Sequence, residues 1–181
     1  GKWASTNIGA NRPQDAGNYY AWGETTLKTD FRWATYAHGT GYKSLTKYSN
    51  SDGLLSLDTA DDAASCTWGG TWRMPTKDEW IELQENCVWT WTDDYNKTGV
   101  AGYVVASKSS DASLFLPAAG CRYANQFNEK GIHGYYWSSS LHQNPTYYGS
   151  AYQLQFFQDY FKPDWNYTRY YGSSVRGVCK P

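Results

Sequence analysis

The spacing of apolar residues changes along the chain and predicts where helices and strands lie. Trp80, Leu83 and Cys87 recur three to four residues apart, which is the spacing of one face of an α-helix. Thr76 and Glu79 stand three residues apart at the start of this run, in the pattern of a capping box. The sequence therefore predicts a helix that begins at Thr76 and buries one side.

A second, shorter helix is expected over residues 59–65. Asp58 is a suitable N-cap, and Asp61 and Asp62 would lie in the first turn, where carboxylates interact favourably with the helix dipole. Two adjacent aspartates could also suggest a catalytic acid pair. A helix N-terminus explains both residues without any chemistry, and we favour that interpretation.

Beyond Cys87 apolar and polar residues alternate, and this period of two is typical of β-strands. Strands are expected over residues 3–8, 88–92, 102–107, 113–118, 135–140, 151–157 and 173–179. Residues 37–56 and 120–134 are expected to form loops. Helices that precede a run of strands predict an α+β fold, in a single domain over residues 1–181.

Aromatic residues are unusually frequent, with 10 Trp and 17 Tyr among 181 residues. Both side chains suit positions with one apolar and one wet side, as in a β-rich domain with a binding face. The net charge is −1 and no basic run occurs, which argues against a nucleic-acid surface or a polybasic membrane patch. No apolar run reaches about 18 residues and no signal peptide is found, so neither a membrane span nor a leader is expected.

Four cysteines, Cys66, Cys87, Cys121 and Cys179, lack the close spacing of zinc or redox motifs. Two disulfides are expected, and three connectivities are possible. We favour Cys66–Cys87 and Cys121–Cys179, each of which would stabilise the fold by about 3–4 kcal/mol in the chain-entropy model. Disulfides would place the protein outside the cytoplasm. The alternative is that some of the cysteines are small buried residues in a reducing compartment.

Residues 134–172 combine many aromatic rings with few charges. This segment holds 14 aromatic residues among 39, and its only charged residues are Asp159, Lys162, Asp164 and Arg169. Tyr, Ser, Gly and Asn dominate antibody paratopes, because Tyr offers a large contact area at low entropic cost and short polar side chains hydrogen-bond adaptably. The composition indicates a ligand-binding surface, and we expect the display region at about 135–172.

Short sequence blocks along nearly the whole chain resemble one bacterial family. The blocks are Lys2-Trp3-Ala4, Asn7-Ile8-Gly9-Ala10, Tyr20-Ala21-Trp22-Gly23-Glu24, Asp61-Asp62-Ala63-Ala64, Trp72-Arg73-Met74-Pro75-Thr76, Leu116-Pro117-Ala118-Ala119-Gly120, Tyr136-Trp137-Ser138-Ser139 and Ser174-Val175-Arg176. In these blocks the chain resembles the Fibrobacter succinogenes major paralogous domain family, a C-type-lectin-like group abundant in gut Bacteroidetes and their phages.

The resemblance implies a C-type lectin-like fold, with two helices, a small antiparallel sheet and a long C-terminal region that presents ligand-binding residues. The same fold carries formylglycine-generating enzymes, sugar-binding lectins and the variable proteins of diversity-generating retroelements. In the variable proteins, adenine-directed mutagenesis rewrites the C-terminal segment while scaffold positions stay fixed. The resemblance therefore narrows the fold more than the function.

Side-chain alternation divides the display region into an inward-facing frame and outward-facing positions. Tyr152, Leu154 and Phe156 match scaffold positions of the family and are expected to face the core. The family resemblance implies further frame residues at Trp137, Ser138, Ser139, Pro163, Arg169, Gly172, Val175 and Arg176. The expected ligand-binding residues are His142, Gln143, Asn144, Tyr147, Tyr148, Gln153, Gln155, Phe157, Asp159, Tyr160, Asp164, Trp165, Asn166, Tyr167, Tyr170 and Tyr171.

Codon chemistry bears on whether this surface is diversified. Tyr, Asn, Asp, His and Phe can be reached by changing adenines in Asn-type codons, whereas the Gln residues and Trp165 need Lys- or Gln-type template codons. The pattern is compatible with a retroelement-diversified face. The alternative is an ordinary Tyr-rich family member whose rings pack on one another or on a neighbouring domain.

Other functional sites find little support in the sequence. Gln143-Asn144-Pro145 and Asp164-Trp165-Asn166 have the wrong order and too few carboxylates for the calcium site of a sugar-binding lectin, so no metal or other cofactor is expected. Residues 94–99 resemble the start of an EF-hand loop, but Val105 stands where the last ligand should be, and a hairpin turn is expected instead. Hydrolase, phosphate-loop and zinc-protease motifs are absent from the sequence.

The sequence thus predicts a non-enzymatic recognition domain that binds a protein or glycan on a cell surface. It would lie outside the cell, on a bacterial surface or a phage virion. A fixed surface or pilus-tip adhesin with glycan-binding activity is the alternative. An oxidase of the formylglycine-generating type is disfavoured, because that chemistry needs a closely spaced reactive cysteine pair.

Overall fold

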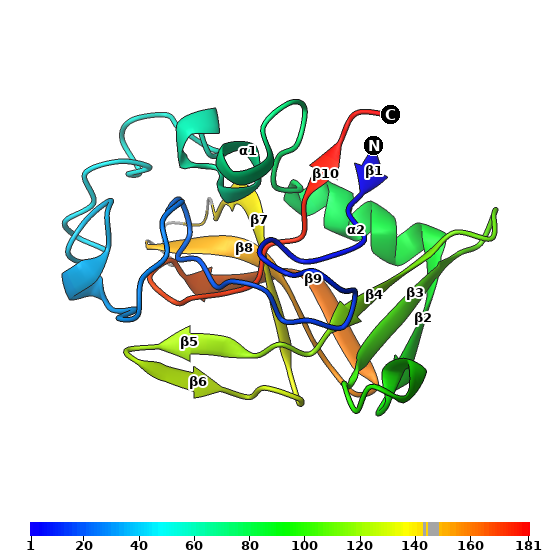
Figure 1. Ribbon diagram of the computed structural model, residues 1–181. Helices are drawn as coiled ribbons and strands as arrows, with labels where there is room; N and C mark the ends of the chain where they lie inside the picture. Colours follow the sequence, from blue (N-terminus) through cyan, green and yellow to red (C-terminus); the bar gives the residue numbers. More distant parts are fainter. Residues whose placement is uncertain (143, 145–148) are drawn as a thin grey trace.

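The computed structural model describes residues 1–142, 144 and 149–181. The described chain has two α-helices and small antiparallel sheets, so the predicted α+β class is confirmed (Figure 1). The two ends of the chain meet, because β1 (Lys2–Trp3) pairs with β10 (Val178–Cys179) in an antiparallel register.

Helix α2 (Lys77–Asn86) forms where the capping box predicts it. The Thr76 side chain accepts a hydrogen bond from the Glu79 backbone N–H at 3.1 Å, and the Glu79 carboxylate accepts one from the Thr76 N–H at 2.9 Å. Trp80 and Leu83 are buried on one side of the helix. Cys87 is the C-cap and the first residue of the next strand, so the apolar spacing overestimates the helix by one residue.

Helix α1 (Ala63–Trp68) begins later than the sequence predicts. Asp62, not Asp58, is its N-cap, and a short 3₁₀ turn at Thr59–Asp61 precedes it. The Asp62 carboxylate accepts hydrogen bonds from the N–H groups of Ser65 at 2.9 Å and Met74 at 2.9 Å. This second bond to a distant residue explains why the cap forms at the second aspartate of the pair.

Strands fill most of the second half of the chain. One sheet has the order β2-β3-β4, with β2 at Cys87–Thr92, β3 at Gly102–Ser107 and β4 at Ser113–Pro117. The other three-stranded sheet has the order β7-β8-β9, with β7 at Gly134–Leu141, β8 at Ser150–Phe157 and β9 at Tyr160–Thr168. A separate hairpin pairs β5 (Cys121–Tyr123) with β6 (Gln126–Asn128).

Several strand predictions were wrong in extent or missing. The predicted strands at 3–8 and 173–179 are reduced to the two-residue strands β1 and β10. The rest of each segment lies beside the other but is joined to it only by isolated backbone hydrogen bonds, such as that from the Ile8 N–H to the Val175 carbonyl at 2.9 Å. The β5–β6 hairpin lies within the predicted loop 120–134. Strand β9 was not predicted because Pro163 and its neighbours interrupt the alternation. The predicted turn at 94–99 does join β2 to β3, with a hydrogen bond from Gly99 N–H to the Asp94 carboxylate.

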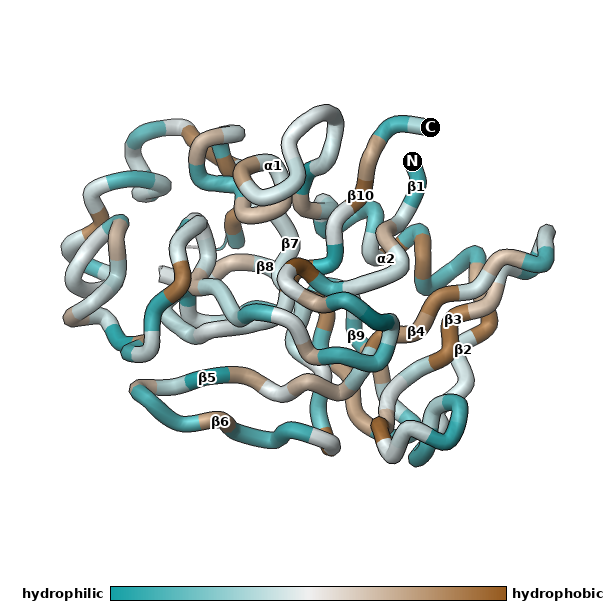
Figure 2. Tube along the Cα trace, viewed as in Figure 1, coloured by the Kyte–Doolittle hydropathy of each residue, from teal (hydrophilic) through white to brown (hydrophobic). Residues whose placement is uncertain are grey.

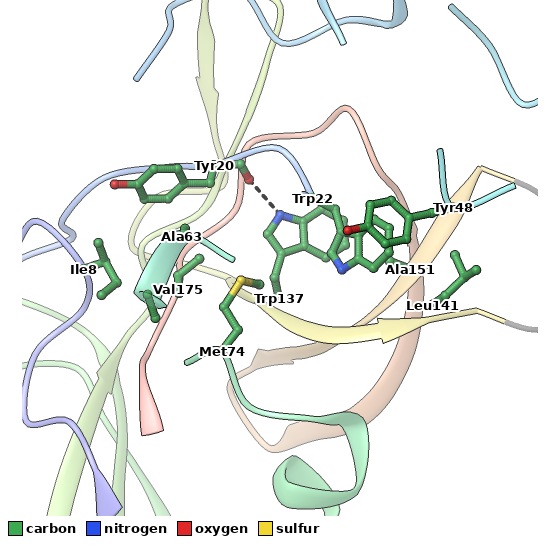
Figure 3. Packing of buried hydrophobic residues seen from close by; sticks show 11 residues of the cluster. Ile8, Tyr20, Trp22, Tyr48, Ala63, Met74, Trp137, Leu141, Ala151 and Val175 are labelled. Atoms are coloured by element: carbon green, nitrogen blue, oxygen red, sulfur yellow. Dashed lines mark hydrogen bonds between the residues drawn. The ribbon is translucent and has the colours of Figure 1, made fainter. Parts of the chain in front are cut away.

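Two aromatic clusters form most of the core. In one, Trp137 lies among residues from distant segments and donates its indole N–H to the Tyr20 carbonyl at 2.7 Å (Figure 3). Trp22 in the same cluster donates to the Ser138 carbonyl at 2.9 Å. In the other cluster, Trp80 of α2 packs with Tyr136 and other residues of the two three-stranded sheets. Each buried indole that packs β7 against the preceding segments therefore also has a hydrogen-bond partner, as buried Trp usually does.

The Arg176 guanidinium joins three segments at the centre of the fold. It is fully buried and donates to the Asn7 side-chain oxygen at 2.8 Å, the Ala4 carbonyl at 3.2 Å and the Phe115 carbonyl at 2.8 Å. Burial lowers the pKa of Arg176 to about 10, so the side chain keeps its charge at neutral pH. These bonds fix the N-terminal segment and β4 against the C-terminal segment.

Replacing Arg176 tests this arrangement. Arg176→Met would leave three buried oxygens without donors, and each such loss costs about 1–3 kcal/mol. We expect the free energy of unfolding in urea to fall by about 3 kcal/mol or more. The matched control is Arg12→Gln, whose guanidinium pairs with Asp15 at the surface and should leave the urea midpoint unchanged. Equal stability of the two variants would contradict the role assigned to Arg176.

Candidate functional site

The register of the β7–β9 sheet determines which side chains share a face. Directly paired residues lie on the same side, and these pairs include Tyr135 with Gln155, Gln155 with Lys162, and Phe157 with Tyr160. We call this side of the sheet the display face; it carries Tyr135, Gln155, Phe157, Tyr160, Lys162, Trp165 and Tyr167, and at its buried end Trp137, Gln153 and Ala151. The opposite side carries Tyr136, Leu154 and Phe156, which are fully buried in the core.

A β-bulge in β9 keeps the aromatic residues of this strand on the display face. Gln153 pairs with Trp165 and Gln155 with Lys162, so β9 has two residues, Pro163 and Asp164, opposite Leu154 alone. Pro163 lacks a backbone donor and is therefore tolerated at such an irregularity. Because of this extra residue, the side chains of Trp165 and Tyr167 lie on the same side of the sheet as Lys162.

The frame residues are buried as the sequence predicts. Each of Trp137, Ser138, Ser139, Pro163, Arg169, Gly172, Val175 and Arg176 is buried. Figure 2 shows β7 in pale colours over most of its length, because Tyr, Trp and Ser have intermediate hydropathy. Simple hydropathy therefore does not separate the frame from the display residues. Side-chain alternation separates them from Leu154 to Phe157 but not at Trp137, which pairs with Gln153 and lies on the same side as Tyr135.

Two residues of β8 depart from the predicted alternation. Gln153 was expected to face outward but is 0% exposed, because the C-terminal segment covers this end of the display face. Its amide donates to Ser173 Oγ at 3.3 Å and accepts from the Gln155 amide at 2.8 Å. Tyr152 was expected in the core but is only half-buried, and its ring lies under the Lys77 ammonium, 4.8 Å from the ring centroid.

The other predicted ligand-binding residues are scattered. Asn166 pairs with Tyr152 on the side opposite the display face, and Asp164 forms an ion pair with Lys162 at 3.0 Å. Asp159 lies in the turn between β8 and β9 with a positive φ of 63°. His142 stacks on Tyr152, and Asn144 is exposed. Gln143, Tyr147 and Tyr148 lie outside the described residues.

Aromatic rings form a continuous row across the display face and the segments beside it, which we call the aromatic track. Successive ring centroids lie 4.4–5.6 Å apart. The order of the rings is Trp33, Tyr170, Tyr171, Tyr167, Tyr135, His133, Phe157 and Tyr160. Phe157, Tyr160 and Trp165, which lies on the same face, are each 38–39% exposed, so large apolar rings remain in contact with water.

A pocket of about 310 Å³ lies between the β5–β6 hairpin and the middle of the aromatic track. We call it the tyrosine pocket, because Tyr123, Tyr135, Tyr167 and Tyr171 line it. Asn128, Glu129 and Cys121 complete its described lining. The Cys121 Sγ lies 3.8 Å from the Tyr167 hydroxyl oxygen, so a thiol and a phenol meet at its base.

Sequence reasoning missed most of the tyrosine pocket, since only Tyr167 and Tyr171 of its described lining were expected to bind a ligand. Tyr123, Asn128 and Glu129 come from the segment predicted as a loop, and Tyr135 was not assigned to the binding surface. The alternation in 121–123 and 126–128 around a two-residue turn was the available signal for the hairpin. Alternation within the display region could not show that a separate hairpin closes one side of the pocket.

The predicted disulfides are absent. All four cysteines are free thiols: Cys66 is exposed, Cys121 is buried, and Cys87 and Cys179 are half-buried. Cys121 and Cys179 lie on strands of different sheets, and the Cys66 thiol instead contacts the carbonyls of Thr59 and Ala60 at 3.6 and 3.4 Å. Burial raises the pKa of the Cys121 and Cys87 thiols, which disfavours the reactive thiolate.

Within residues 1–142, 144 and 149–181, no three His, Cys, Asp or Glu side chains form a group that could hold a metal ion. The helices in the described part of the chain are too short and too polar to cross a bilayer.

Comparisons with protein-family models, curated proteins and solved structures found no match to this chain.

The buried tyrosines of the site predict a loss of stability in alkaline solution. Burial raises the pKa of Tyr167 and Tyr135 well above that of a free tyrosine, so both stay protonated in the folded state when an unfolded chain ionises. The unfolded state then releases more protons, and stability should fall as pH rises above about 10. Tyr167→Phe should make this fall shallower, as measured by urea unfolding between pH 8.5 and 11.

The control is Tyr42→Phe, whose ring is 53% exposed and should leave the pH dependence unchanged. A free energy of unfolding that is constant over this pH range, or a Tyr167→Phe profile identical to that of the parent, would contradict the prediction.

Proposed function

We propose that this chain is a non-enzymatic recognition domain with a C-type lectin-like fold that binds a protein or glycan on a cell surface through its display face. The aromatic track is the observation that carries the proposal. Exposed Trp, Tyr and Phe side chains are the residues that most often anchor binding interfaces. A row of such rings on one face is costly to leave in water unless a partner covers it.

The framework supports a face that can vary without unfolding. The predicted frame residues other than Tyr152 are buried, whereas Phe157, Tyr160 and Trp165 point away from the core. Substitution at exposed positions usually changes stability little. This separation suits a retroelement-diversified variable protein, and it also suits a fixed adhesin or lectin whose rings stack on sugars.

The cysteines support a non-enzymatic role. An oxidase of the formylglycine-generating type would need a closely spaced, reactive pair, and the raised pKa of the buried Cys121 thiol disfavours such reactivity. Because the thiols are free, disulfides give no support to the proposed location on a bacterial surface or phage virion. That location rests on the family resemblance and on the paratope-like composition of the face.

Mutation of the exposed rings tests the recognition function. The labelled protein would be applied to arrays of glycans and of bacterial surface proteins, beside a triple variant with Phe157→Ser, Tyr160→Ser and Trp165→Ser. Because hot-spot rings contribute about 2 kcal/mol or more, the triple variant should bind at least about tenfold more weakly to any ligand found.

The matched control replaces exposed apolar residues elsewhere, Leu27→Ser and Val88→Ser, which are 65% and 53% exposed. Equal loss of binding in both variants, or full binding by the triple variant, would contradict the proposal. The DNA beside the gene separates the two kinds of binder. A template repeat and a reverse transcriptase indicate diversification, and their absence together with sugar binding indicates a fixed lectin.

A further inference from the structure

The tyrosine pocket lies beside the display face and has a distinct charge. Glu129 is the only charged residue in its described lining, which contains no lysine or arginine. The Nδ1 atom of the His133 ring lies 3.3 Å from a Glu129 carboxylate oxygen. The described lining thus combines one carboxylate with four phenol rings.

Neighbouring groups report the same negative environment. Burial raises the pKa of Tyr135 above its usual range, and the charges of Cys121 and Glu129 raise it further. The pKa of the Cys121 thiol is also raised, by burial first, and the charge of Glu129 adds to this effect. Burial, the main cause of both shifts, penalises any charge, whereas the smaller contribution of Glu129 disfavours a second negative charge and favours a positive one.

The chemistry of the lining fits an organic cation better than a neutral or acidic ligand. Ammonium and guanidinium groups are attracted to the faces of aromatic rings, and the attraction strengthens when water is excluded. Glu129 can supply a charge-assisted hydrogen bond to the same group, and its side chain is 47% exposed, so a ligand can reach it. A volume of about 310 Å³ leaves room for the end of one long side chain.

The backbone of Glu129 is also unusual. Its φ of 62° lies in the left-handed region, where a residue with a Cβ costs about 1–2 kcal/mol. Glycine or asparagine would adopt this conformation more readily. A charged side chain held in an unfavourable conformation at a pocket rim is consistent with a binding role.

We propose that the tyrosine pocket binds the side chain of a lysine or arginine on a protein ligand, with Glu129 as the counter-charge. This inference rests on the proposed recognition function and names the chemical group that the face receives. It favours a protein over a glycan as the ligand.

Small probes test the inference without knowledge of the natural ligand. The intact protein, with ¹³C-labelled tyrosine, would be titrated with Nα-acetyl-lysine N-methylamide, its arginine counterpart, the neutral acetyl-norleucine N-methylamide, and methyl glucoside. We expect the two cations to shift the signals of Tyr135, Tyr167 and Tyr171, and the neutral probes to leave them in place. In Glu129→Gln the dissociation constant for the cations should rise by about fivefold or more.

Glu85→Gln is the matched control, since Glu85 is an exposed residue of α2 outside the pocket lining. Equal response to the lysine and norleucine probes, or unchanged affinity in Glu129→Gln, would overturn the inference. Binding of methyl glucoside at the tyrosine signals with no effect of Glu129→Gln would also overturn it and assign the pocket to sugars. The recognition proposal is tested separately, by the binding of the Phe157, Tyr160 and Trp165 triple variant to the arrays, so its failure can be told apart from failure of this inference.

Discussion

The buried guanidinium of Arg176 is the constraint on which the arrangement of the fold depends. Its three acceptors come from the N-terminal segment and from β4, which lie far apart in the sequence. One of them, Asn7, also donates to the Tyr136 hydroxyl at 3.1 Å, so the network reaches β7. A charge without such bonds would be very costly to bury, and the segments must therefore close around it together.

This closure allows the other side of the β7–β9 sheet to be rich in aromatic rings. Tyr136, Leu154 and Phe156 pack on α2 and on the neighbouring sheet, so the core side of the β7–β9 sheet is buried. The display face then contributes little to holding the sheet in place at its Phe157 end. The β9 bulge at Pro163 adjusts the register so that Trp165 and Tyr167 share that face. We therefore place the binding function at the exposed end of the display face, whose side chains are not needed to keep the protein folded.

Local patterns predicted the features whose causes are local. The capping box of Thr76 and Glu79 located α2, and alternation from Leu154 to Phe156 identified the core side of β8. Features that depend on distant contacts were missed. Asp62 became a cap because Met74 approaches it, and Gln153 is buried because Ser173 lies over it.

In the candidate site, too, features with local causes were predicted and features that depend on distant contacts were not. Phe157, predicted from alternation, and Tyr160, Trp165 and Tyr167, predicted as residues between the family-like frame positions, lie on the display face. The hairpin that closes the tyrosine pocket was not predicted, because its strands have only three residues each and its turn contains Ala124 with a φ of 50° rather than a glycine. Disulfide pairing was wrong because cysteine spacing alone does not reveal whether two strands share a sheet.

The most direct test is a saturation mutagenesis scan of residues 134–172, scored only for folding by resistance to proteolysis. The account predicts that substitutions at Trp137, Leu154, Phe156 and Arg169 abolish folding, whereas Phe157, Tyr160, Trp165 and Tyr171 accept most polar residues. If the second group proves as intolerant as the first, the aromatic track belongs to the core of the protein and the binding face does not exist.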